Sequence, residues 1–312
     1  TARALSRLSR FDPAPYADRT VDDWIAEQRL PADAAALVRM LVRISTYTDA
    51  PDQLSAGAGI AQAAVGLAGV TYLDGGWQRI VDDLSAAASA AGVEIRHHTP
   101  AQTVVRAAAG WAVEAGTGTG TTTDRVDAVI LAGLSPAAAA RLLDATPADL
   151  GWDVLGPPVR ASCLDLGVRR PATFATLFAV DEPLYLSTHA PPADLAPEGM
   201  GVVHLLRYLA PGENPDATVT RAQLEAHAAL AGLRPDDIVE QRYLHRMTVA
   251  HALPLASAGG LAGRPPVAVR ERPGVFVAGD WVGAEGLLAD ASVSSARAAA
   301  AAAVSRAAVV AR

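Results

Sequence analysis

The residues whose types and spacing best suit ligand binding lie near the C-terminus, in the run 275–299. A short apolar, β-prone segment that predicts a buried strand is followed by Gly279 and Asp280. After Gly286, an alanine-rich helix is predicted to begin near Leu288. A strand that turns into a helix N-terminus places free backbone N–H groups and a partial positive charge at one point. Such a point suits a phosphate, or the electron-rich carbonyl edge of a flavin ring.

The same spacing also fits an ordinary strand–turn–helix unit in which Asp290 caps the helix. An aspartate at this position typically stabilises a helix by about 0.5–2 kcal/mol. Spacing alone supports the two interpretations equally.

The residues of this run are similar to the C-terminal FAD signature of a known superfamily. The sequence GDWVGAEGLLADASVSSARAA resembles the signature of the flavin amine oxidases, protoporphyrinogen oxidases and phytoene desaturases. The resemblance implies that Gly279 and Asp280 contact the ribityl–phosphate part of FAD. It also implies that Gly286, Leu287 and Leu288 open the helix beneath the flavin pyrimidine.

The chain departs from that signature at two pairs of residues. Asp290-Ala291 and Ser294-Ser295 stand where the family has Gly-Ala and Ser-Gly. Small residues are mostly kept, so a close approach of the helix to a cofactor stays possible. A carboxylate at Asp290 beside a reduced, anionic flavin is unfavourable, which favours the capping role for this residue.

Earlier segments follow the order of the same family. Asp74 and the two glycines after it predict a turn that resembles the family's Gly-Gly turn before a helix. Segment 99–101 matches the family position whose backbone passes the FAD adenine, which implies that Ala101 contacts the cofactor. The expected helix carries apolar residues at helical spacing, and further strands and a helix follow: Trp77, Ile80, Val81 and Leu84, then strands at 93–95, 111–114 and 126–132, and a helix from Ser135.

One element of this family has no counterpart in the printed sequence. Its members open with a strand, a G-x-G-x-x-G turn, a helix and then an acidic residue. Gly57-Ala58-Gly59 lacks the third glycine and a preceding strand, and segment 116–120 is predicted to be a hairpin turn. The chain also begins with Thr1. We therefore expect the N-terminal FAD-binding segment to be missing from this sequence.

The length, charge and residue composition of the chain argue against several classes of protein. A chain of 312 residues is long enough for two domains. Its net charge of −7, without a basic run, argues against nucleic acid as a partner, and no apolar run is long enough to span a bilayer. The single Cys163 rules out an internal disulfide and fits a reducing cytoplasm. Spacings typical of metal sites do not occur. We expect a cytoplasmic protein that acts on a small molecule.

The chain contains no lysine, because all 26 of its basic residues are arginine. A lysine Schiff base is therefore excluded. Many amine oxidases hold a lysine near flavin N5 through a water, and this residue has no counterpart here. The resemblance therefore points to the desaturase-like and porphyrinogen-oxidase-like branches. No cysteine lies near the predicted flavin helix, so FAD is expected to be bound non-covalently.

The expected fold belongs to the mixed α/β (α+β) class. It combines an incomplete, Rossmann-like FAD-binding domain with an inserted substrate domain made of an antiparallel sheet and helices. We assign 1–70 to the helical part of the substrate domain, 71–150 to the FAD domain, 151–255 to the substrate-domain sheet and 256–312 to the C-terminal FAD-binding segment. The elements expected within them are helices at 24–28 and 34–47, the latter with Leu37, Met40, Leu41 and Ile44 on one face, strands at 159–168, 174–180, 202–209 and 242–251, and a helix at 221–230.

Candidate catalytic residues are few. Strict alternation along 242–251 places Tyr243, His245 and His251 on the same face of a strand. The family resemblance implies that this strand runs towards the flavin, so either histidine is a candidate to face substrate. A histidine on a strand is more often structural, and we leave the catalytic residues unassigned.

These observations predict an FAD-dependent oxidoreductase of the desaturase or oxidase type. Flavin N5 would accept a hydride from a largely apolar small molecule, with most of the chemistry supplied by the cofactor. One alternative is a non-catalytic lipid or prenyl carrier on the same fold, against which the flavin-contacting motif argues. Another is an inert chain that cannot hold FAD, because the adenosine half of the site is missing. The sequence does not indicate the substrate, the electron acceptor or the oligomeric state.

Overall fold

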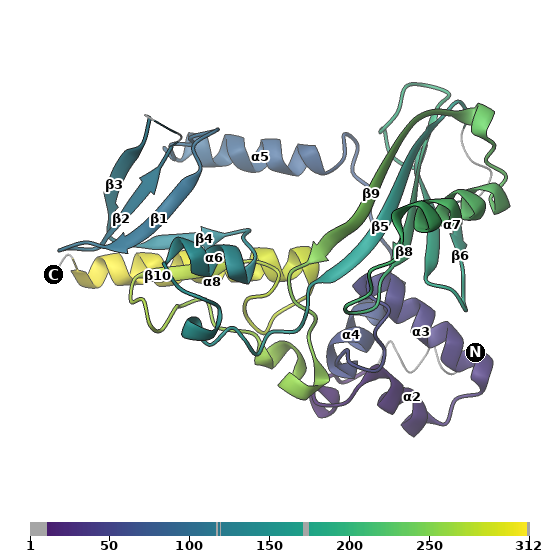
Figure 1. Cartoon of the computed structure of the whole chain (residues 1–312), viewed down its shortest axis with the longest axis horizontal. Coiled ribbons are helices and arrows are strands. Elements are labelled where there is room, and N and C mark those ends of the chain that lie inside the picture. The colour runs from purple at the N-terminus through teal and green to yellow at the C-terminus, as the bar shows by residue number, and fades with distance from the viewer. Residues whose placement is uncertain (1–10, 117, 119, 171–174, 311–312) are drawn as a thin grey trace.

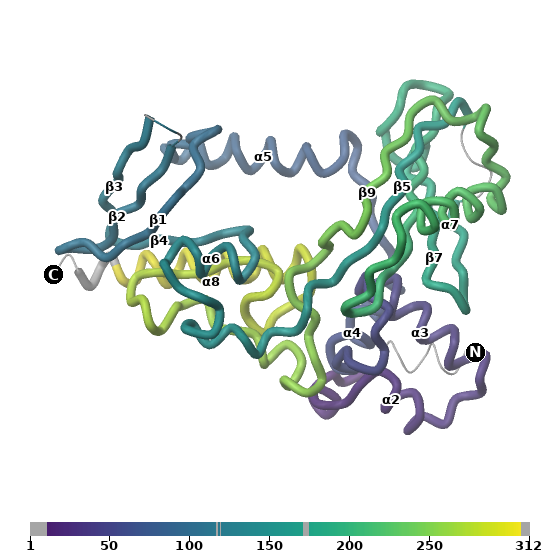
Figure 2. The backbone as a smooth tube through the Cα atoms, viewed as in Figure 1, coloured from purple at the N-terminus to yellow at the C-terminus, as the bar shows by residue number. Residues whose placement is uncertain are grey.

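A computed structural model describes residues 11–116, 118, 120–170 and 175–310 of the chain. Figures 1 and 2 show an elongated molecule, with a small sheet at one end and a larger sheet at the other. The C-terminal helix runs along the side of the small sheet, and the N-terminal helices lie below the large one. Some predictions fall partly outside the described residues. These are the hairpin turn at Thr117 and Thr119, the strand start at Phe174 and the first ten residues of the helical part.

The N-terminal part is helical, as predicted. After a short 3-10 turn (η1, Ala14–Tyr16) come α2 (Val21–Gln28), α3 (Ala32–Thr46) and α4 (Ala56–Leu67). Helix α2 begins with a capping box, in which the hydroxyl of Thr20 accepts from the N–H of Asp23 at 3.0 Å and the carboxylate of Asp23 accepts from the N–H of Thr20 at 3.1 Å. The helices share one core with the ends of two strands, formed by Val21, Trp24, Val38, Val42, Leu54, Ile60, Val159 and Leu253.

The buried face of α3 differs from the predicted one. Of Leu37, Met40, Leu41 and Ile44, only Met40 is buried. The core-facing stripe is instead Ala35, Val38, Val42 and Thr46. Both sets recur at helical spacing, so periodicity alone does not separate them. Contact with α4, itself rich in alanine and glycine, favours the stripe with the smaller side chains.

The large sheet has five antiparallel strands in the order β6-β7-β8-β5-β9. Their bounds are β6 Thr176–Phe178, β7 Leu184–Ala190, β8 Gly201–Tyr208, β5 Val159–Val168 and β9 Ile238–Ala250. Helix α7 (Ala217–Leu230) covers one face through a core that includes Leu164, Leu186, Leu205 and Leu224. The predicted strands at 159–168, 202–209 and 242–251 are confirmed with small shifts in their ends, whereas β7 was not predicted.

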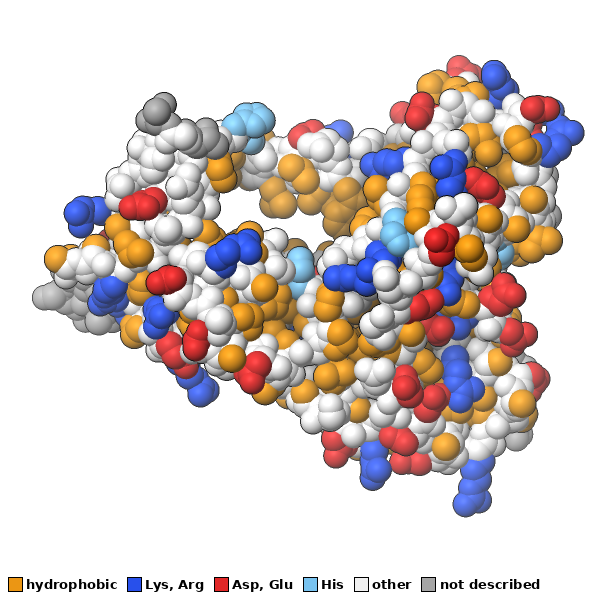
Figure 3. All heavy atoms as spheres, viewed as in Figure 1, with side chains coloured by type: hydrophobic (Ala, Val, Ile, Leu, Met, Phe, Trp, Pro, Cys, Tyr) orange, Lys and Arg blue, Asp and Glu red, His pale blue; other side chains and the backbone are white. Residues whose placement is uncertain are grey.

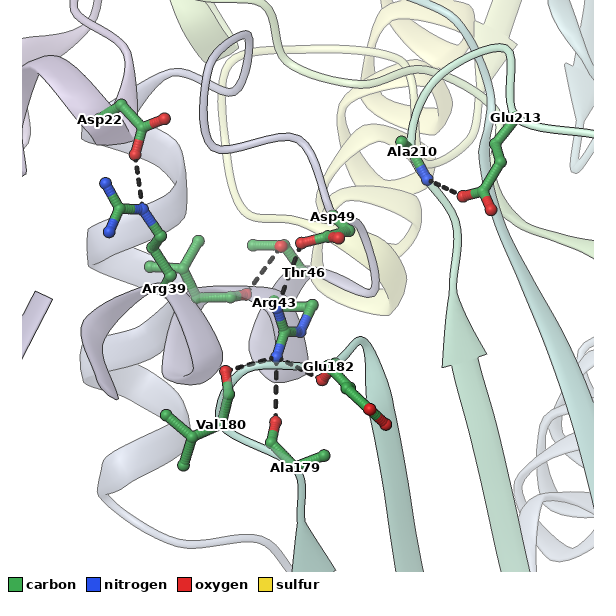
Figure 4. Close-up of polar contacts among 11 residues, drawn as sticks. Asp22, Arg39, Arg43, Thr46, Asp49, Ala179, Val180, Glu182, Ala210 and Glu213 are labelled. Atoms are coloured by element: carbon green, nitrogen blue, oxygen red, sulfur yellow. Dashed lines mark hydrogen bonds and ion pairs between the residues drawn. The ribbon is translucent and has the colours of Figure 1, made fainter. Parts of the chain in front are cut away.

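Arg43 joins the N-terminal helices to the large sheet. Its side chain is 7% exposed. Its Nη2 atom donates to the carbonyl oxygens of Ala179, Val180 and Glu182 at 3.0, 3.1 and 2.7 Å, in the turn between β6 and β7 (Figure 4). Its Nη1 atom pairs with Asp49 at 3.2 Å. The planar guanidinium can satisfy several acceptors at once, which fixes α3 against this turn.

Two smaller sheets lie at the other end of the molecule. Strands β1 (Ala101–Arg106), β2 (Trp111–Ala115) and β3 (Thr122–Val126) are antiparallel, and β4 (Val129–Ala132) pairs in parallel with β10 (Val275–Ala278). The predicted strand at 126–132 is therefore two strands, because the chain leaves one sheet after Val126 and enters another at Val129. The predicted strand at 93–95 is wrong, since this segment lies in a loop with Val93 and Ile95 exposed.

Helix α5 (Trp77–Ala90) forms where the sequence predicts it, but its apolar residues are not buried. The exposed fractions of Trp77, Val81 and Leu84 are 70%, 53% and 65%. Figure 3 shows an opening through the molecule between α5 and the layer below it, with hydrophobic side chains on the α5 side. The apolar face of α5 thus has no packing partner within the described residues.

The layer below α5 holds the C-terminal unit. Strands β4 and β10 pack against α6 (Pro136–Leu142) and α8 (Leu288–Val310), with Trp152 and Trp281 in edge contact in the core between them. The structure confirms the mixed α/β class with antiparallel sheets and helices. Among the described residues, no helix is long and apolar enough to cross a membrane.

We predict that replacing Arg43 by leucine lowers the free energy of unfolding by about 1–3 kcal/mol, because three carbonyls lose a charged donor. Urea-induced unfolding measures this change. Arg79→Leu is the matched control, since Arg79 and its partner Asp83 are each 69% exposed. Its effect should stay within about 0.5 kcal/mol. Equal losses in the two variants would show that Arg43 does not hold the helices to the sheet.

Candidate functional site

The end of β10 and the beginning of α8 form the predicted site, which we call the β10–α8 junction (residues 279–290). All four residues of β10 are buried. The N–H of Gly279 donates to the hydroxyl of Ser295 at 3.0 Å, and that hydroxyl donates to the carbonyl of Gly279 at 3.1 Å. Ser295 is one of the departures from the family signature, and here it ties the strand end to the helix.

Asp280 is bound to the end of the large sheet. Its Oδ2 atom accepts from the backbone N–H of His251 at 2.9 Å, and its Oδ1 atom lies 2.9 Å from Nδ1 of the same residue. His251 directly follows β9, and the Asp280 side chain is only 12% exposed. An ionised carboxylate only accepts, so Nδ1 donates and Nε2 of a neutral His251 remains an acceptor. Asp280 thus fixes the orientation of His251, a role that the sequence did not indicate.

The junction presents free backbone donors at the helix start. The N–H groups of Gly286, Leu287 and Leu288 donate no backbone hydrogen bond within the described residues. Leu288 has a positive φ of 55°, which is uncommon for a residue other than glycine. Such backbone strain concentrates at functional sites. The donors and the positive end of the α8 dipole together favour an electron-rich ligand.

Asp290 does not cap α8. It lies in the first turn of the helix, is exposed, and its own N–H donates to the carbonyl of Leu287 at 3.1 Å. The cap interpretation is therefore wrong. Near the helix N-terminus, the carboxylate still interacts favourably with the helix dipole.

Arg264 is a residue of this site that the sequence analysis missed. It is 8% exposed, and its Nη1 atom donates to the carbonyl of Gly286 at 2.9 Å. Its Nε atom is buried without a hydrogen-bond partner. Burial lowers the pKa of Arg264 to about 10, against the opposing effect of the Asp280 charge, so the side chain is still cationic at neutral pH. It lies in a glycine- and proline-rich part of the predicted C-terminal FAD-binding segment, and no sequence signal marked it.

The two candidate histidines of the predicted strand lie at different sites in the structure. The hydroxyl of Tyr243 donates to the carbonyl of Ala217 in α7 and lies 3.1 Å from Nδ1 of His245. His245 is therefore on the α7 side of the sheet, away from the junction. The strict alternation fails because β9 shifts register opposite β5 and Arg246 adopts a φ of 49°. Only His251 reaches the junction.

Ala101 stands apart from the other predicted cofactor contacts. It is the exposed first residue of β1. Figure 1 shows β1–β3 beside the C-terminal half of α8, whereas the junction lies at the start of that helix. The structure thus brings together Gly279, Asp280, Gly286, Leu287 and Leu288 and leaves Ala101 at a separate position.

The junction fits the pyrimidine and ribityl–phosphate part of a flavin. It combines unsatisfied N–H groups, a helix N-terminus and a buried guanidinium with a free Nε–H. All three interact favourably with negative charge. Both carboxylate oxygens of Asp280 are already engaged by His251.

Comparisons with known proteins bear on the family and the fold. Residues 45–304 match the family model of the flavin containing amine oxidoreductases. An oxidoreductase structure from Methanosarcina mazei is similar with a TM-score of 0.66 and 17% identity, over 89% of this chain and 67% of that one. Cyclohexylamine oxidase from Brevibacterium oxydans is similar with a TM-score of 0.63 and 16% identity, over 99% and 74%. At these identities the two structures show the fold alone. No curated protein sequence matches the chain.

We predict that Gly286→Ala destabilises the protein more than Gly283→Ala. Both glycines have a positive φ, at 70° and 76°, so each alanine should cost about 1–2 kcal/mol through its backbone. Only at Gly286 would the new Cβ lie 2.7 Å from the Cβ of Asp290, whereas no atom lies within 4 Å at Gly283. Urea-induced unfolding, followed by tryptophan fluorescence, measures both. Equal losses would contradict close packing at the helix start.

Proposed function

Because the chain belongs to the flavin-containing amine oxidoreductase family, we propose that it binds FAD non-covalently and oxidises a largely apolar small molecule. Membership of the family makes the protein an oxidoreductase. When bound, the flavin supplies N5 as the acceptor of a hydride, and this is the hard part of the chemistry. The chain supplies binding, orientation and charge. The observation that carries the proposal is the set of free N–H groups at the positive end of α8.

The start of α8 and Arg264 would hold the negative side of the cofactor. The N–H groups of Gly286, Leu287 and Leu288 would donate to its electron-rich edge, and the α8 dipole would favour the extra electron density of the reduced ring. An interaction of this kind is typically worth about 0.3–1 kcal/mol. Arg264 shapes the same loop through its bond to the carbonyl of Gly286 and adds a fixed positive charge.

Asp280 and His251 would connect the cofactor site to the substrate domain. The two bonds between them hold the end of β9 at the junction. The His251 side chain is 32% exposed, so its ring is accessible near the proposed flavin. We assign His251 a positioning role, because Asp280 holds both its backbone N–H and its ring.

The position of Cys163 supports non-covalent binding. It lies in β5, is 5% exposed, and burial raises the pKa of its thiol to about 12. The nucleophilic form of a cysteine is the thiolate, which is scarce at neutral pH with such a pKa. The only cysteine in the chain therefore offers no bond to the flavin.

Two exposed surfaces support the expectation of a further FAD-binding segment. One is the apolar face of α5, and the other is the parallel pair β4–β10, where Ile130 is 38% exposed. Parallel sheets are normally covered on both faces and contain more than two strands. We infer that these surfaces accept a strand–turn–helix segment that binds the adenosine half of FAD, beside Ala101.

The division of the chain into domain segments at residues 70, 150 and 255 remains a prediction.

We predict that Asp280→Ala weakens FAD binding by about tenfold, because the buried N–H of His251 loses its acceptor and the junction loosens. Titration of FAD, followed by the change in flavin fluorescence, measures the dissociation constant. Asp83→Ala is the matched control, since that carboxylate is 69% exposed and lies on α5, outside the junction. Its effect should stay within about twofold. Unchanged binding in Asp280→Ala would remove Asp280 from the site.

A further inference from the structure

The face of the large sheet that α7 leaves uncovered carries two distinct rows of side chains. Residues directly opposite one another in neighbouring antiparallel strands point to the same face. The polar row, in the strand order β6-β7-β8-β5-β9, is Thr176, Ser187, His204, Asp165 and Arg242. The next row, which we call the apolar row, is Phe178, Tyr185, Leu206, Cys163 and Leu244. A fully polar row that crosses all five strands is unusual beside an apolar one.

The apolar row lies between the polar row and the proposed flavin site. Val159, at the start of β5, lines a small cavity together with Leu287 and Leu288 of the β10–α8 junction. Asp165 is six residues further along β5, which corresponds to about 20 Å in an extended strand. A ligand that lies along this face from the junction passes the buried pair Ala161 and Tyr208, and then reaches the apolar row before the polar row.

The charges within the polar row cancel. Arg242 donates to Oδ2 of Asp165 from Nε at 3.1 Å and from Nη2 at 2.8 Å, and Nδ1 of His204 lies 2.6 Å from Oδ1. Burial raises the pKa of Asp165, but the bonds from His204 and Arg242 outweigh it, so that the pKa is lowered overall. Asp165 is therefore an anion at neutral pH, and its countercharge is already beside it.

The centre of the polar row is His204, whose Nδ1 atom is engaged by Asp165. In the tautomer in which Nδ1 carries the proton and donates to this carboxylate, Nε2 carries the free lone pair. The ring of His189 lies 4.4 Å from that of His204, and the ring of Tyr72 lies 4.6 Å from His189. Burial, together with the nearby His204, lowers the pKa of His189 to about 4, which leaves it uncharged at neutral pH. The hydroxyl of Tyr72 lies 3.2 Å from that of Ser187 and adds a donor.

We propose that the polar row, through Nε2 of His204, binds a neutral hydroxyl group at the far end of an elongated substrate whose apolar part lies on the apolar row. This inference rests on the proposed function and specifies its substrate class. A hydroxyl can donate to Nε2 and accept from a neighbouring hydroxyl. A charged end group would lose its hydration without finding an unpaired countercharge. The Asp165 and His204 side chains are 20% and 30% exposed, so a ligand can reach them.

Three amines of equal chain length test the proposal: ω-hydroxydodecylamine, dodecylamine and ω-aminododecanoate. Calorimetry on the purified chain, with and without added FAD, gives their dissociation constants. We expect ω-hydroxydodecylamine to bind about 3- to 10-fold more tightly than dodecylamine, the gain of one hydrogen bond. NMR of the histidine ring nitrogens should show a shift at Nε2 of His204. Equal binding of the three amines, or tightest binding of the carboxylate, would overturn the proposal.

Variants separate ligand recognition from a purely structural role of the row. His204→Phe replaces the imidazole by another aromatic ring, which can still contact His189. This variant should lose the preference for the hydroxyl and bind dodecylamine with unchanged affinity. His245→Phe, on the α7 side of the same sheet, is the matched control and should keep the preference. If His204→Phe does not fold, His204→Gln, which can still bond to Asp165, should reduce the preference. A preference that survives in both His204 variants contradicts the proposal.

The outcomes also distinguish this inference from the proposed function. Preferred binding of the hydroxyl probe without reduction of the flavin would support the polar row and contradict the oxidoreductase chemistry on such amines. Reduction of the flavin by all three amines at equal affinity would support the function and overturn the role of the row.

Discussion

The carboxylate of Asp280 connects the two parts of the molecule on which the proposed chemistry depends. Both of its oxygens are engaged by His251, so the end of β9 is held where β10 turns towards α8. Ser295 fixes the same turn from the helix side through Gly279. Since β9 belongs to the large sheet, these bonds also fix the position of that sheet relative to the start of α8. The proposed substrate site and the proposed cofactor site share this corner of the molecule for this reason.

The sequence was most informative where local chemistry alone determines structure. The strand from Val159 to Val168 is mostly apolar apart from Arg160, Ser162 and Asp165, and the unit around β10 is marked by Gly279 and Gly286. The apolar face of α3 was predicted wrongly, because Ala35 and Thr46 carry little hydrophobic signal although they face the core. The pattern of α5 predicted a helix, but a sequence cannot show that Trp77 has no packing partner in the described chain. Which face is buried depends on neighbours far away in sequence.

The candidate site was predictable to the extent that it resembles a known motif. The resemblance led to Asp280 and Leu288, and the structure adds the strained φ of Leu288. It did not lead to Arg264, because the segment around it is rich in glycine and proline and its bond to the carbonyl of Gly286 arises only in the folded chain. Strict alternation grouped His245 with His251, but β9 shifts its register against β5 between these two residues, so that only His251 reaches the junction. Strand irregularities of this kind leave no periodic signal.

The central claim is that the β10–α8 junction binds a flavin. Equilibrium dialysis of the purified chain against FAD, followed by visible absorbance, tests it most directly, beside a version that carries a preceding dinucleotide-binding segment. If the junction binds FAD, flavin bands are in excess on the protein side, more strongly for the extended version. Equal flavin on both sides of the membrane for both versions would contradict it and favour a non-catalytic carrier on the same fold.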